Sequence, residues 1–187
     1  ILSADVKGYS VLMADDEVHT IETLKAHRHK ISDLVSKHSG RVVDSPGDNI
    51  LAEFRSSVDA VECAVKIQKA LDKENSKYVD DKKVQFRIGV NIGDVIQDGD
   101  RIYGNGVNVA ARIEGLADPG GVCISRNVYN HVGNKLSWGY EYLGVHTVKN
   151  IKKPVRAYKL LMADEDAGKL IGVKPNPVVK NWIWATG

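Results

Sequence analysis

The sequence predicts an α+β fold in which a mostly antiparallel sheet is built around a ferredoxin-like split βαβ core, with helices packed on it. Strand-like and helix-like segments follow one another in the order strand, helix, hairpin, helix, strand pair, helix and short strands. Two long segments have apolar residues at helical spacing, and residues 84–92 alternate strictly between apolar and other residues. We expect the helices to gather on one side of this sheet.

The N-terminal part is predicted as a short strand at residues 1–6, a turn at 7–10 and a long helix at 16–38. Gly8 gives the turn its backbone freedom. If a helix begins at this turn, its first backbone amides are available to an anion.

A hairpin is predicted at residues 40–54, with Asp48 at its bend. Ile50, Ala52 and Phe54 fall on one face of the second strand, which is the period-two pattern of β structure. A carboxylate in a tight turn often only bonds its own backbone. Asp48 by itself is therefore compatible with a structural or a functional role.

The middle of the chain contains a second amphipathic helix, which begins with a capping box at Ser56. The polar residues 73–83 connect this helix to the alternating strand at 84–92. We expect this strand to continue through 93–96, after which the chain turns back at 98–100.

A glycine-rich turn at 104–106 is predicted to lead into a helix that presents Asn108 and Arg112 on one face, because these residues are four apart. The glycines complete neither a dinucleotide fingerprint nor a Walker loop. On the residues alone, this face is either solvated or catalytic. Four further elements are predicted, at 122–125, 127–132, 140–148 and 155–161.

Composition excludes several classes of protein. The 187 residues are 43% hydrophobic and 27% charged, which is typical of a globular protein, and the formal charge of +2 gives no general basic surface for nucleic acid. The two cysteines are far apart, so neither a disulfide framework nor a zinc site is indicated. No apolar run approaches the roughly 20 residues of a membrane helix. A cytoplasmic location fits best.

Three segments resemble, in order and in spacing, the signatures of class III nucleotide cyclases of the bacterial type. These segments are residues 4–10, 47–49 and 104–112. The resemblance covers about residues 1–161, which we interpret as the catalytic domain. Residues 162–187 are interpreted as a C-terminal tail or linker towards a missing segment, with an apolar patch at 182–184 that either covers its own domain or leads into a segment such as a membrane anchor.

The resemblance implies conversion of ATP to 3′,5′-cyclic AMP and pyrophosphate, with GTP as the alternative substrate. Two Mg²⁺ or Mn²⁺ ions would be held by Asp5, Asp48 and the backbone carbonyl of Val6. Asn108 would hold the ribose, and Arg112 would face the α-phosphate. The other phosphates would be met by the amides of Gly8, Tyr9 and Ser10 and by Lys152 or Lys149, of which Lys152 is preferred.

Two residues depart from the family's pattern at the positions that select the base. Where adenylyl cyclases usually carry lysine and guanylyl cyclases glutamate, this chain has Asp44. Where adenylyl cyclases often carry aspartate, it has Arg101. A carboxylate and a guanidinium can bond either base and use guanine more fully. ATP is kept as the expected substrate because bacterial-looking members mostly use it.

The resemblance also implies a head-to-tail homodimer, in which the metal aspartates of one subunit meet the Asn/Arg helix of the other. One alternative is a catalytically silent module that senses nucleotides or dimerises. Another is an RNA-binding sheet, which the near-neutral charge and the two phenylalanines disfavour.

Overall fold

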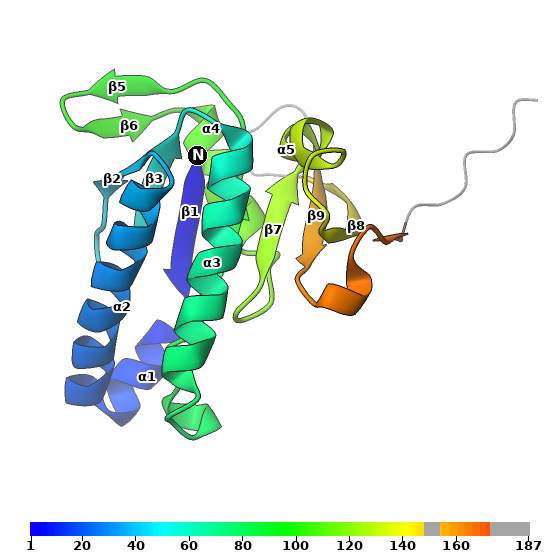
Figure 1. Cartoon of the computed structure of the whole chain (residues 1–187). Coiled ribbons are helices and arrows are strands. Elements are labelled where there is room, and N and C mark those ends of the chain that lie inside the picture. Colours follow the sequence, from blue (N-terminus) through cyan, green and yellow to red (C-terminus); the bar gives the residue numbers. More distant parts are fainter. Residues whose placement is uncertain (148–153, 173–187) are drawn as a thin grey trace, which may run out of the picture.

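Figure 1 shows the computed structural model of the chain, which describes residues 1–147 and 154–172. Within these residues eight strands form one sheet, in the order β10-β8-β9-β7-β4-β1-β3-β2. Neighbouring strands are antiparallel, except that β4 pairs with β7 and β8 with β10 in parallel. The strands are β1 (Leu2–Val6), β2 (Gly40–Asp44), β3 (Ile50–Phe54), β4 (Phe86–Val90), β7 (Val122–Ser125), β8 (Gly139–His146), β9 (Val155–Leu161) and β10 (Leu170–Ile171). The predicted fold class, α+β with a mostly antiparallel sheet, is confirmed.

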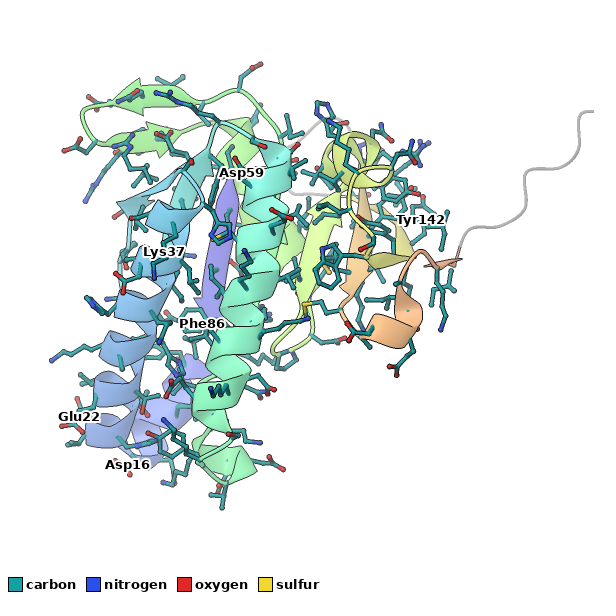
Figure 2. The ribbon with its side chains drawn as sticks, in the orientation of Figure 1. Asp16, Glu22, Lys37, Asp59, Phe86 and Tyr142 are labelled. Carbon is teal, nitrogen blue, oxygen red and sulfur yellow. The ribbon has the colours of Figure 1, made fainter. Side chains whose placement is uncertain are left out.

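The two long helices begin where the sequence predicts. The side chain of Asp16 accepts a hydrogen bond from the backbone N–H of His19 at the start of α2, and Ser56 accepts one from Asp59 at the start of α3. Figure 2 shows Asp16 and Asp59 at these helix starts. The helices are α1 (Tyr9–Asp15), α2 (Glu17–Lys37), α3 (Ser57–Asn75), α4 (Asn105–Glu114) and α5 (Arg126–Val132), with short 3₁₀ turns at Asp80–Lys82 and Asp164–Asp166.

The main hydrophobic core lies between the sheet and the pair α2 and α3, which run side by side across one face (Figure 1). Phe86 of β4 is fully buried in this core and lies between the two helices in Figure 2. Ile88 and Val90, two and four residues further along β4, belong to the same cluster, as the period of two requires.

The expectation that the helices gather on one side of the sheet is wrong for α4. This helix packs on the opposite face, where Ile113 forms a separate cluster with Ala117 and Cys123 of β7. Gly89 permits the close approach. A Cβ at this position would lie 2.3 Å from the backbone nitrogen of Glu114 and 2.4 Å from the carbonyl oxygen of Ala110. The missing side chain in β4 therefore allows the backbone of α4 to lie directly on the sheet.

The predicted continuation of the strand through residues 93–96 is also wrong. The strand ends at Val90, and the chain then forms a separate two-stranded hairpin of β5 (Ile96–Asp98) and β6 (Arg101–Tyr103). The predicted turn at 98–100 is confirmed, with Gly99 at a φ of 58°. Directly after Val90, the backbone of Asn91 still exchanges hydrogen bonds with Ile1, next to β1. The buried Asn91 side chain donates a hydrogen bond to the carbonyl of Gly106, which ties this segment to the start of α4.

Within the described residues, no helix is both long and apolar enough to cross a membrane.

Candidate active site

The fold brings Asp5 and Asp48 together. Asp5 lies near the end of β1, and Asp48 lies in the turn between β2 and β3. β1 pairs with β3 in antiparallel register, with Ala4 opposite Ile50, so the turn that precedes Ile50 reaches the end of β1. The two carboxyl groups lie close enough for Asp5 to act on the ionisation of Asp48. Residues 43 positions apart in the sequence therefore form one acidic pair.

Burial and the neighbouring Asp5 carboxyl raise the pKa of Asp48 to about 6. The backbone amides of Asp48 itself and of Val6 oppose this by donating hydrogen bonds to the Asp48 carboxylate. Two carboxylates in contact repel each other when both are ionised, and a divalent cation with a preference for oxygen ligands relieves that repulsion. The donor chemistry of Asp5 and Asp48 thus fits Mg²⁺ or Mn²⁺.

No group of three or more His, Cys, Asp or Glu side chains within residues 1–147 and 154–172 is arranged to hold a metal ion. Any metal site at Asp5 and Asp48 therefore takes its further oxygen ligands from backbone carbonyls, water or a bound substrate. This composition is usual for Mg²⁺, which keeps several waters and binds through one or two carboxylates together with phosphate groups.

Two charged residues beside Asp5 were not among the predicted site residues. Nη2 of Arg87 lies 2.9 Å from Oδ2 of Asp5 and 3.7 Å from Oε1 of Glu114. Oε2 of Glu114 in turn accepts a hydrogen bond of 2.8 Å from the hydroxyl of Ser3. Burial raises the pKa of Glu114 to about 7. Arg87 occupies one of the alternating positions of β4 that point away from the main core, where a charged residue is ordinary, so the sequence carries no distinctive signal for it.

Asn108 and Arg112 are both exposed on α4. Among the described residues, neither side chain forms a hydrogen bond or an ion pair with Asp5 or Asp48. The structure therefore does not join the two predicted halves of the site within one chain.

The two predicted base-selecting residues lie close together. Nε of Arg101, at the start of β6, is 3.8 Å from Oδ2 of Asp44, at the end of β2. The Asp44 side chain also accepts a hydrogen bond from the backbone N–H of Ser45. Arg101 is mostly exposed, so this ion pair is weak by itself and can open to admit another partner.

The predicted phosphate-binding residues fall in two places. Gly8, with a φ of 71°, precedes α1, and Tyr9 and Ser10 are the first residues of that helix. No side chain caps this helix start. Lys149 and Lys152 lie outside the described residues.

A cavity of about 790 Å³ opens beside the first turn of α4, away from Asp5 and Asp48. Its lining includes Gly104–Gly106, Val109, Arg126, Pro154 and Arg156. Val109 directly follows Asn108, and Pro154 directly follows the lysine-rich segment. The cavity therefore borders the half of the predicted site that the aspartates do not supply.

Comparison with known proteins gives a consistent result. The family model described as "Adenylate and Guanylate cyclase catalytic domain" matches residues 1–162. A curated relative from Rhizobium meliloti, "Putative adenylate cyclase 3", is 44% identical over 159 residues, which are 84% of this chain and 27% of that protein. The chain thus spans about a quarter of the length of this relative.

Solved structures agree with the family model. The crystal structure of an adenylate/guanylate cyclase/hydrolase from Silicibacter pomeroyi matches with a TM-score of 0.80 and 35% identity, covering 86% of this chain and 94% of that one. The adenylyl cyclase CyaB from P. aeruginosa matches with a TM-score of 0.71 and 20% identity, covering 89% and 95%. The second match shows likeness of fold alone.

Proposed function

Because the chain belongs to the family of adenylate and guanylate cyclase catalytic domains, we propose that it converts ATP to 3′,5′-cyclic AMP and pyrophosphate. The observation that carries this proposal is the contact between the carboxyl groups of Asp5 and Asp48. Cyclisation attaches the ribose 3′-oxygen to the α-phosphorus and releases pyrophosphate, so negative charge develops on both the entering and the leaving oxygen. A pair of acidic ligands at this point of the fold is what that reaction requires.

Asp5, Asp48 and the carbonyl of Val6 would bind two Mg²⁺ or Mn²⁺ ions. When bound, such ions stabilise the charge on the entering and leaving oxygens. Arg112 places a permanent positive charge at the α-phosphate, and Asn108 orients the ribose. The amides of Gly8, Tyr9 and Ser10 bind the β- and γ-phosphates together with Lys152.

We propose that the active protein is a homodimer with two shared sites. Asn108 and Arg112 are exposed, and among the described residues they form no hydrogen bond or ion pair with the aspartates of their own chain, so a partner chain would bring the halves together. The hairpin β5–β6 also exposes large apolar side chains, with Ile96 at 70% and Tyr103 at 48% exposure. Such side chains are suited to an interface between subunits.

GTP is the second candidate substrate, and the pair Asp44 and Arg101 favours it. Arg101 can donate to N7 of either base but to O6 of guanine alone, and Asp44 can accept from N1–H and the amino group of guanine. The ion pair between the two side chains must open for either base to bind. Purified protein assayed with Mn²⁺ and either ATP or GTP identifies the substrate by the cyclic product. Absence of both products would favour the silent nucleotide-sensing module instead.

Mixing two inactive variants tests the shared site. Asp48→Ala removes a metal ligand and Arg112→Ala removes the α-phosphate contact. Each variant alone is expected to be inactive, whereas random mixing of equal amounts restores about a quarter of the wild-type rate, because half of the dimers are mixed and each has one intact site. A mixture of Asp48→Ala with Asp5→Ala is the matched control and stays inactive. Equal activity in the two mixtures would refute the shared site.

A further inference from the structure

Arg87 lies between two carboxylates that belong to different elements of the fold. Its Nη2 atom is 2.9 Å from Oδ2 of Asp5 on β1 and 3.7 Å from Oε1 of Glu114 on α4. The first distance is a charge-assisted hydrogen bond, and the second is an ion pair beyond hydrogen-bond range. One nitrogen therefore serves both carboxylates, bonded to one and near to the other.

This guanidinium is not fixed on all sides. Its Nε atom is buried and has no hydrogen-bond partner among the described residues. The Arg87 and Glu114 side chains are 19% and 6% exposed, so water screens them little. Glu114 is held by the hydroxyl of Ser3 through its other oxygen, which leaves Oε1 facing Arg87.

The charges around Arg87 do not balance. Asp5 and Asp48 both act on the ionisation of Glu114, and Asp5 also acts on that of Asp48. Arg87 brings one positive charge to these three carboxyl groups, bonded to Asp5 and near Glu114. A divalent cation at Asp5 and Asp48 would make the bond from Arg87 to Asp5 unfavourable, because two positive groups would then compete for one carboxylate.

We propose that Arg87 competes with the divalent cation for Asp5, and that Glu114 receives the guanidinium when the cation binds. Arg87 and Glu114 are then positioning residues that set the affinity for the cation without contacting it. The movement is short, since Nη2 already lies 3.7 Å from its second partner. This inference depends on the cation site at Asp5 and Asp48 in the proposed function.

Binding of Mn²⁺ to the nucleotide-free chain, followed by the electron paramagnetic resonance signal of free Mn²⁺ at about pH 8, tests the proposal without any enzymatic readout. Arg87→Gln removes the competitor and is expected to tighten Mn²⁺ binding about tenfold. Glu114→Gln removes the second partner and is expected to weaken it about tenfold. Glutamine keeps the shape of Glu114 and can still accept the hydrogen bond from Ser3.

The double variant Arg87→Gln/Glu114→Gln distinguishes movement of Arg87 from Asp5 to Glu114 from a general effect of removing charge near the cation site. If Arg87 moves to Glu114, the Glu114→Gln change weakens binding by about threefold or less once Arg87 is already glutamine. Independent effects of the two substitutions, or weaker binding in Arg87→Gln, would overturn the proposal. If Arg87→Gln shows no cooperative thermal transition, Arg87→Met, which also removes the charge, replaces it, and the same non-additivity with Glu114→Gln is expected.

Two controls complete the experiment. Arg41 and Glu53 form another Arg–Glu pair in the same sheet, with an N–O distance of 2.8 Å, and Arg41→Gln and Glu53→Gln repeat the charge changes there. These variants are expected to change Mn²⁺ affinity less than about twofold, and a change as large as that at Arg87 would contradict a specific role. Asp48→Asn is expected to abolish binding. Unchanged binding in that variant would refute the proposed cation site itself, which is a different result from additivity at Arg87 and Glu114.

Discussion

Replacing Glu114 with glutamine is expected to stabilise the protein at neutral and alkaline pH and to leave its stability in acid almost unchanged. Glu114 is buried, and burial raises the pKa of its carboxyl from 4.5 to about 7. The folded chain therefore holds a proton that the unfolded chain releases. The stability that comes from this proton is complete below about pH 4.5 and is lost as the pH rises through about 7.

The size of the effect follows from the two pKa values. A tenfold change in an equilibrium constant is worth about 1.4 kcal/mol. Because folding raises the pKa of Glu114 from 4.5 to about 7, ionisation of this carboxyl lowers the free energy of unfolding by about 3 kcal/mol above pH 7. Glutamine is neutral at every pH and keeps an acceptor for Ser3. Glu114→Gln should thus match the wild type near pH 4.5 and exceed its free energy of unfolding by about 3 kcal/mol near pH 8.

Urea unfolding with a chelator present, at several pH values between about 4.5 and 8, measures this difference. At about pH 8, the expected difference of about 3 kcal/mol corresponds to a gain in Tm of about 6 to 12 °C for a domain of this size. The pKa of Asp48 is raised to about 6, so this residue also makes the free energy of unfolding fall with rising pH, in the wild type and in Glu114→Gln alike. The comparison therefore uses the difference between the free energies of unfolding of the two proteins. Glu114→Asp retains a titrating carboxyl and should retain the pH dependence. Parallel curves for the wild type and Glu114→Gln would refute the reasoning.

Three further outcomes are expected. Gly89→Ala places a Cβ 2.3 Å from the backbone nitrogen of Glu114, so α4 must move, and urea unfolding should show a loss of about 3 kcal/mol; a loss below about 0.5 kcal/mol would contradict the packing. Cys63 and Cys123 are fully buried and burial raises the pKa of each thiol to about 12, so a thiol reagent should label them only in denaturant, and rapid labelling of the native protein would disprove their burial. Ser56→Ala removes the cap of α3 and should cost about 1 kcal/mol of unfolding free energy, whereas Ser57→Ala, one residue later, should cost less.

Much of the fold could be predicted because its signals are local. Asp16 and Ser56 mark the starts of α2 and α3 through bonds to residues three positions later, and the hairpin at 40–54 is set by its own turn and alternation. The wrong predictions concern segments whose path depends on residues far away in the sequence. Residues 93–96 leave the sheet next to Asn91, whose side chain bonds the start of α4, and Gly89 leaves room for the backbone of α4 on the opposite face.

The types of site residue were also readable from the sequence. Asp5, Asp48, Asn108 and Arg112 stand in segments whose order and spacing identify the family, although their roles in metal and substrate binding stay predictions. Arg87 and Glu114 were missed because a single charged residue in a strand or at a helix end has no distinctive sequence pattern.

The sequence by itself determined most of the helices and strands, where the long helices begin and which family the chain belongs to, because these properties depend on neighbouring residues and short motifs. Only the tertiary structure decided that Asp48 contacts Asp5, that Arg87 bonds Asp5 and that Glu114 lies within reach of Arg87. These contacts join residues 27 to 82 positions apart. They depend on the register of β1 against β3 and β4 and on the height of α4 above the sheet, which are set by packing of the whole domain.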